Sequence, residues 1–116
     1  MGDDQSALPY ELAPREVKAK LDAGEALALL DVREPFEHTL THIEGCELIP
    51  MNTVPARLQH IEGLAEGGLL VVYCHHGVRS LSVVSWLRAQ GVANCISMSG
   101  GIEGWSLEVD RRVPRY

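Results

Sequence analysis

Two runs of consecutive apolar residues constrain the fold of this chain more than any other feature. Residues 26–32 (ALALLDV) are nearly all apolar and end at a charged turn, and residues 69–73 (LLVVY) run from a glycine pair to a cysteine. A strand with one face in water alternates apolar and polar residues, and these two runs do not. They are typical of strands in a sheet that is covered on both faces. Residues 48–49 and 95–98 are weaker strand candidates.

A helix is predicted between the last two strand candidates, over residues 80–90, with Gly91 placed to end it. Four apolar residues fall on one side of this helix: Leu81, Val83, Val84 and Leu87. Strand, helix and strand in this order make a βαβ unit, which requires parallel strands. Residues 14–24 predict another helix, with proline in its first turn. We therefore expect an α/β fold, with a mainly parallel central sheet flanked by helices on both faces.

Length and composition limit the classes of function. The 116 residues suit a single domain, 1–116, with a core over about 10–116, a flexible lead-in at 1–8 and a short tail at 110–116. A net charge of −6 is the wrong sign for a nucleic-acid binder, and it favours a monomer. No apolar run reaches the roughly 18 residues of a membrane span. We expect no nucleic-acid or membrane partner.

The cysteines indicate a reducing compartment. Cys46, Cys74 and Cys95 are odd in number and form no Cys-x-x-Cys pair, unlike the framework of a secreted disulfide protein. The N-terminus lacks the basic start and apolar stretch of a signal peptide. We therefore expect a cytoplasmic protein. Cys95, inside a predicted strand, is expected to be a core residue.

Residues 74–79 (CHHGVR), here called the cysteine loop, join a buried strand directly to a helix. Ligands of open parallel sheets bind beyond the carboxyl ends of the strands, where this loop lies. Its shortness requires a tight wrap, which Gly77 permits, and turns backbone N–H groups inward beside the helix N-terminus. The helix dipole and Arg79 both favour a Cys74 thiolate. The pattern predicts a nucleophile at the floor of an anion-binding cup.

A plainer interpretation treats Cys74 as an inert residue at the end of a buried strand and Arg79 as a surface charge. A lone free cysteine is most often of that kind. Here strand, cysteine, glycine-bearing loop, arginine and helix occur together and in order. That combination favours the reactive interpretation.

The cysteine loop and its surroundings resemble those of the rhodanese family of sulfurtransferases, especially its small single-domain bacterial members. The resemblance extends from about Tyr10 to Tyr116. Five segments, in order, carry the resemblance: residues 30–34 (LDVRE), 42–50 (HIEGCELIP), 73–80 (YCHHGVRS), 99–105 (SGGIEGW) and 113–116 (VPRY). The family usually has a small apolar residue where Cys46 stands. The chain departs from the family there, and a second thiol therefore comes into question.

The resemblance implies that Cys74 takes a sulfane sulfur from thiosulfate or another persulfide donor. The resulting persulfide would pass its sulfur to a thiophilic acceptor such as cyanide, a small thiol or a protein, with no cofactor. Arg79 would attract an anionic donor or brace the loop through its carbonyls. The implied donor-binding residues are those of the loop and the residue after it: His75, His76, Gly77, Val78, Arg79 and Ser80.

Two alternatives remain open. A phosphatase or arsenate reductase shares the fold, but its loop is one residue longer than the four residues that separate Cys74 from Arg79 here. No well-placed aspartate offers a general acid for a leaving alkoxide. A non-catalytic rhodanese-like binding module is the second alternative. Inactive members typically lose the cysteine, and this chain keeps Cys74.

Other polar residues near the predicted site have structural interpretations. Asp31 and Arg33 at a strand end suggest an ionic network, with Glu44 as a partner of Arg33. His75 and His76 are expected to point outward to solvent or a partner. We expect no metal site, because Cys74 and the two histidines after it cannot all converge on one ion. Whether Cys46 forms a disulfide with Cys74 depends on their distance, which the sequence does not give.

Overall fold

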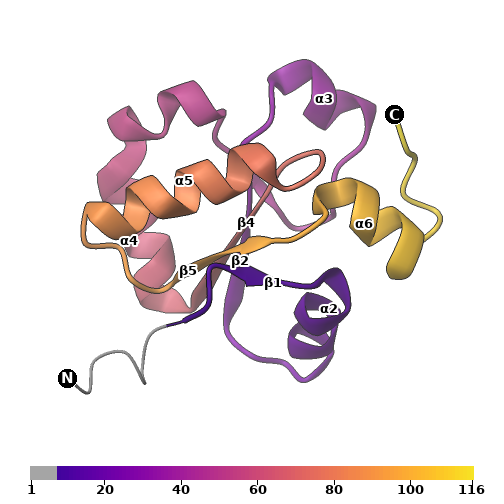
Figure 1. The fold of residues 1–116 in the computed structure, drawn as a ribbon, viewed down its shortest axis with the longest axis horizontal. Coiled ribbons are helices and arrows are strands. Elements are labelled where there is room, and N and C mark those ends of the chain that lie inside the picture. The colour runs from indigo at the N-terminus through magenta and orange to yellow at the C-terminus, as the bar shows by residue number, and fades with distance from the viewer. Residues whose placement is uncertain (1–7) are drawn as a thin grey trace.

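The computed structural model describes residues 8–116, which form a five-stranded sheet between two layers of helices (Figure 1). Five strands make the sheet: β1 (Glu11–Leu12), β2 (Leu27–Asp31), β3 (Glu47–Leu48), β4 (Leu69–Tyr73) and β5 (Cys95–Met98). Their spatial order is β1-β5-β4-β2-β3, and every pairing is parallel. The predicted α/β class with a parallel central sheet is confirmed. Residues 1–7 of the predicted lead-in lie outside the described residues.

Helices cover both faces of the sheet (Figure 1). On one face α4 (Leu58–Gly67) and α5 (Val78–Ala89) pack through residues such as Ile61 and Leu87 onto Val72. On the other, α2 (Pro14–Asp22) and α6 (Gly101–Glu108) pack through Val17 and Ile102. The core therefore lies in two layers, as the unbroken apolar strands predict. A short helix, α3 (Pro35–Leu40), follows β2, and two 3₁₀ turns, η1 (Met51–Thr53) and η2 (Pro55–Arg57), follow β3.

The predicted elements agree with the observed ones apart from their ends. The bounds of β4 and β5 are as predicted, while β2 is one residue shorter than 26–32 at each end. Helix α5 starts at Val78 rather than at residue 80, because Gly77 adopts the left-handed conformation (φ 102°) and ends the loop at once. The predictions omit β1, α3 and α4. None of the helices in the described part of the chain is both long and apolar enough to span a membrane.

The strand order places a ligand crevice between β2 and β4. These strands are neighbours, with Asp31 opposite Tyr73, but β2 leads on to β3 at one side and β4 to β5 at the other. Chain connections that leave neighbouring strands in opposite directions open a gap at their carboxyl ends, where α/β proteins bind ligands. The residues just beyond those ends are Arg33 and Cys74.

The start of α6 rests directly on the cysteine loop. The N–H groups of Ile102 and Glu103 donate to the carbonyls of Cys74 and His75, at 2.9 and 3.1 Å. Gly101 allows this approach, because a Cβ there would overlap both carbonyl oxygens, and its φ of 61° disfavours other residues. Helix α6 therefore holds the backbone of the loop in place.

Replacing Gly101 by alanine should destabilise the protein by about 2–4 kcal/mol, through backbone strain and overlap with the loop carbonyls. Urea unfolding at neutral pH would measure the change. Gly63→Ala is the matched control, because Gly63 lies in α4 with open space around its Cα. That variant should be neutral or gain up to about 1 kcal/mol from helix propensity. Equal stability of the two variants would contradict the close contact between Gly101 and the carbonyls of the cysteine loop.

Candidate active site

The Cys74 side chain lies at the floor of the cysteine loop, 1% exposed, and its sulfur is surrounded by hydrogen-bonding groups. The backbone N–H groups of Gly77 and Ser80 donate to Sγ at 3.1 and 3.3 Å. The Ser80 hydroxyl lies 3.4 Å from Sγ and 2.8 Å from the hydroxyl of Ser97 on β5. Donors directed at a sulfur stabilise negative charge on it. The arrangement therefore surrounds the sulfur with donors from the loop and from the start of α5.

Further N–H groups of the loop are left without backbone partners. Within the described residues, no carbonyl accepts from the N–H groups of His75, His76, Val78 or Arg79. They belong to the same tight turn and to the first turn of α5, whose N-terminus carries a partial positive charge. An anionic group above the Cys74 sulfur would meet these donors.

Arg79 is held by a carboxylate that the sequence analysis missed. Its two terminal nitrogens donate to the Glu37 carboxylate of α3 at 2.8 and 3.0 Å, in a two-pronged ion pair. This pair lowers the pKa of Glu37 to about 2 and raises that of Arg79. In this structure Arg79 bonds a side chain of another element, and not the loop carbonyls, which were one of the two targets expected for it.

Tyr116 joins the Glu37–Arg79 pair to the strand-end ion pair. Its hydroxyl donates to Glu37 Oε2 at 2.6 Å and accepts from Arg33 Nη1 at 2.9 Å. Its ring stacks on the His75 ring, with centroids 3.8 Å apart and planes 7° from parallel. Burial, together with the Glu37 carboxylate, raises the pKa of Tyr116 to about 12, so the hydroxyl stays protonated at neutral pH. The predicted tail at 110–116 therefore returns to the site.

Asp31 and Arg33 belong to a buried ionic network, as the sequence predicts, but they pair with each other and Glu44 has no part in it. Arg33 Nη2 and Nε donate to the two Asp31 oxygens at 2.8 and 2.9 Å, and Nη2 also donates to the carbonyl of Thr41. Glu44 is exposed, and the expected Arg33–Glu44 pair is wrong. The guanidinium is already saturated by the nearer Asp31, whose carboxylate needs a buried partner.

The two histidines of the loop lie side by side rather than free in solvent. His75 is half-buried and stacks on His76 with centroids 3.9 Å apart, while His76 is exposed. Burial lowers the pKa of His75, with His76 as a further cause. The nitrogens of both rings lie within 4.8 Å of a Glu103 oxygen, so these three residues could approach one cation. Glu103 instead binds Arg115 at 2.6 Å, and the stacked rings are poorly aimed at a shared ion.

The other two thiols lie outside the cysteine loop. Cys46 packs on the α2 and α6 face of the sheet, with the Tyr73 hydroxyl 3.3 Å away, whereas Cys74 belongs to the core under α4 and α5. The sheet lies between them, so Cys46 is not placed to form a disulfide with Cys74. Cys95 is fully buried in β5, as predicted. Burial raises the pKa of both Cys46 and Cys95.

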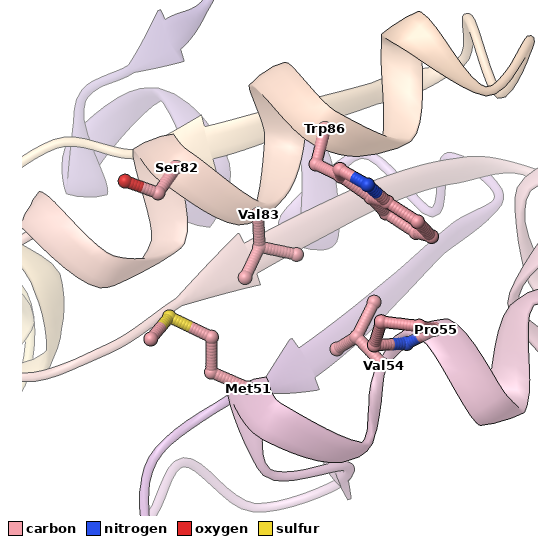
Figure 2. A pocket seen from close by; sticks show the side chains of 6 residues that line it. All are labelled: Met51, Val54, Pro55, Ser82, Val83 and Trp86. Carbon is pink, nitrogen blue, oxygen red and sulfur yellow. The ribbon is translucent and has the colours of Figure 1, made fainter.

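A hollow of about 140 Å³ lies beside α5 (Figure 2). Figure 2 shows two sets of side chains facing each other across it: Met51, Val54 and Pro55 from the η1–η2 segment, and Ser82, Val83 and Trp86 from α5. None of the six is charged. The hollow offers apolar contact but no acid, base or metal ligand, so the reactive groups of this face are those around Cys74.

Comparison with known proteins shows the family to which this chain belongs. The family model for the rhodanese-like domain matches residues 13–108, which include every strand after β1 and the whole cysteine loop. The chain belongs to the rhodanese-like domain family. Among solved structures, this rhodanese-like domain is similar to a rhodanese-like domain protein from Staphylococcus aureus, with a TM-score of 0.76 and 28% identity over 93% of this chain and 99% of that one. A rhodanese-related protein from Thermoplasma volcanium gives a TM-score of 0.75 and 28% identity, over 87% of this chain and 94% of that one.

Curated relatives of this rhodanese-like domain include sulfurtransferases. The "Probable adenylyltransferase/sulfurtransferase MoeZ" of Mycobacterium tuberculosis is 34% identical over 97% of this chain and 28% of its own length. The adenylyltransferase and sulfurtransferase MOCS3-2 of Zea mays is 35% identical over 88% of this chain and 22% of its own length. The chain thus spans about a quarter of these relatives.

Glu37 and Tyr116 are the site residues that sequence reasoning missed. Both lie far along the chain from Cys74, and each acts through a contact between separate elements, namely α3 or the segment after α6 with the cysteine loop. The sequence did contain a signal for Glu37. This carboxylate comes three residues after Glu34, shortly beyond β2, and therefore lies near the sheet edge that carries the cysteine loop. For Tyr116, no spacing or periodicity in the sequence indicates a place near the site.

Glu37 should make stability depend on acid pH. Its pKa lies below its ordinary value of 4.5, at about 2, so its contribution is complete above about pH 4.5 and is lost as the pH falls toward 2. Glu37→Gln should therefore lower the free energy of unfolding at pH 7 by about 2–3 kcal/mol and flatten its decline between pH 4.5 and 2. Urea unfolding over that range measures both effects.

Glu44→Gln provides the control for this prediction, since Glu44 is exposed and has no ion-pair partner among the described residues. It should leave both the stability at pH 7 and the acid decline unchanged. A Glu37→Gln variant with the wild-type pH profile would mean that the Glu37–Arg79 pair does not form in solution.

Proposed function

We propose that this domain is a sulfurtransferase that carries a sulfane sulfur as a persulfide on Cys74. The Cys74 thiolate attacks the outer sulfur of thiosulfate, a Cys74 S–S bond forms, the sulfur–sulfur bond of thiosulfate breaks, and sulfite leaves with the electron pair. Cyanide then attacks the outer sulfur of the persulfide, releases thiocyanate and restores the thiolate. A small thiol or a protein thiol can replace cyanide, and another persulfide can replace thiosulfate.

The donor set at the Cys74 sulfur is the observation that supports this proposal most strongly. Gly77 and Ser80 donate backbone N–H groups to Sγ itself, and unpartnered loop N–H groups remain for an atom above it. A persulfide is one sulfur atom longer than a thiolate and carries its charge on the outer sulfur. Fixed amide donors at that point stabilise charge as an oxyanion hole does.

The site geometry supports sulfur transfer over the phosphatase alternative. Four residues separate Cys74 from Arg79, one fewer than the phosphatase signature has, and the smaller ring suits a single sulfur better than a tetrahedral phosphate. Both guanidinium nitrogens that would hold phosphate oxygens bind Glu37. With a pKa of about 2, Glu37 is ionised at neutral pH and has no proton for a leaving alkoxide.

The other alternative is a non-catalytic rhodanese-like binding module, and the buried thiol argues against it. A cup that only binds an anion gains nothing from a sulfur at its floor, because a thiolate repels the anion. Here the N–H groups of Gly77 and Ser80 are directed at that sulfur. The enzyme interpretation uses both the sulfur and its donors.

Intact-mass measurement after incubation with thiosulfate tests the persulfide directly. Wild type should gain one sulfur atom, and cyanide should remove it with release of thiocyanate. Cys46→Ser and Cys95→Ser are the matched controls and should behave as wild type, because the loop donors are directed at the Cys74 sulfur. Cys74→Ser should gain nothing.

A gain of sulfur by Cys74→Ser would place the carrier on another thiol and refute the mechanism. If wild type gains nothing from thiosulfate, the same measurement with a persulfide donor distinguishes a choice of donor from a failure of the proposal. No gain from either donor would leave the cup as a binding site.

A further inference from the structure

The cations around the cysteine loop are all engaged with carboxylates. Among the described residues, three arginines contact this region: Arg33 pairs with Asp31, Arg79 with Glu37, and Arg115 with Glu103 at the start of α6. Each pair is close, with nitrogen–oxygen distances from 2.6 to 2.8 Å. The loop thus lies among guanidinium groups whose charges are balanced.

The Arg79–Glu37 pair matters most, because Arg79 ends the cysteine loop and lies in the first turn of α5. The next residue, Ser80, donates its backbone N–H to the Cys74 sulfur at 3.3 Å, so Arg79 and the sulfur belong to one site. Glu37 is only 7% exposed, and Tyr116 donates a further hydrogen bond to it, so this carboxylate is fixed rather than free to turn away. Its permanent negative charge cancels much of the Arg79 field at the loop.

We propose that Glu37 is a specificity-determining residue, which withholds the charge of Arg79 from the donor and so selects donors with one negative charge over those with two. The proposal rests on the sulfurtransferase function above and narrows its donor class. Neutral backbone N–H groups and the α5 dipole remain to balance one charge on the donor. The second charge of a dianion meets Glu37 and a chain of net charge −6.

Two donors that differ by one charge make the test possible. Thiosulfate is a dianion, and methanethiosulfonate presents the same outer sulfur on a monoanion. In each case Cys74 forms its S–S bond with the outer sulfur, and the leaving group departs with the electron pair, as sulfite or as methanesulfinate. Thiocyanate release to cyanide reports both reactions. The quantity to compare is the ratio of kcat/KM for thiosulfate to kcat/KM for methanethiosulfonate.

Glu37→Gln should raise this ratio about five- to tenfold at low salt, because it frees one positive charge near the donor. The gain should shrink as salt is added. Arg79→Gln should lower the ratio, since it leaves Glu37 unbalanced. The double variant Glu37→Gln with Arg79→Gln should return the ratio to that of wild type. Because a ratio is measured, a general loosening of the loop, which slows both donors, cancels.

Direct binding of the donor by Arg79 gives a different pattern. In that case Arg79→Gln and the double variant both lower the ratio, and Glu37→Gln leaves it unchanged, which would overturn the proposal. If Glu37→Gln does not fold, the comparison of Arg79→Gln with the double variant still decides between the two patterns. Sulfur transfer from both donors with an unchanged ratio refutes the charge selection alone. No transfer from either donor refutes the proposed function with it.

Discussion

Two backbone hydrogen bonds at the start of α6 fix the peptide groups that surround Cys74. They bind the carbonyls of Cys74 and His75 from the outside, through the N–H groups of Ile102 and Glu103. In a trans peptide the N–H points opposite to the carbonyl, so the N–H groups of His75 and His76 must face the other way, toward the mouth of the loop. The donor set of the site therefore follows from packing between α6 and the loop, and Gly101 makes that packing possible.

The same loop is held from its other side by charge. Asp31–Arg33 at the end of β2 and Glu37–Arg79 between α3 and α5 are linked through the Tyr116 hydroxyl. Buried ion pairs add little net stability when both partners are compared with apolar residues, but losing one partner is costly. These pairs thus act mainly by fixing geometry. They fix where α3 and the segment ending in Tyr116 lie relative to Cys74.

The sequence specifies the centre of the site better than its surroundings. Cys74 could be predicted because the signals for it are local: an apolar strand, a glycine that permits a left-handed turn, and a helix with an apolar face. Glu37 and Tyr116 were not predicted, because Glu37 meets Arg79 across 42 residues of chain and Tyr116 meets Glu37 across 79, and only packing brings them together. The same reason explains why the predicted Arg33–Glu44 ion pair is wrong. The sequence does not show which carboxylate lies nearest to Arg33.

Local signals were also weak where secondary structure was missed. Helix α4 contains glycines and starts without a side-chain cap, and α3 has only six residues, so tertiary contacts decide both. Strand β1 is two residues long and is defined by its pairing with β5. In contrast, β4 and β5 are almost wholly buried and mainly apolar runs, and local sequence was enough to predict their ends.

Burial alone does not separate Cys74 from Cys95, because both are almost wholly inaccessible. Their hydrogen bonds differ in direction. The Cys95 thiol donates to the carbonyl of Val92 at 3.3 Å, and a thiolate there would face the oxygen lone pairs. The Cys74 sulfur instead accepts from two N–H groups. The turn at Gly77 thus provides Cys74 with backbone donors, and the proposed sulfur transfer depends on that feature.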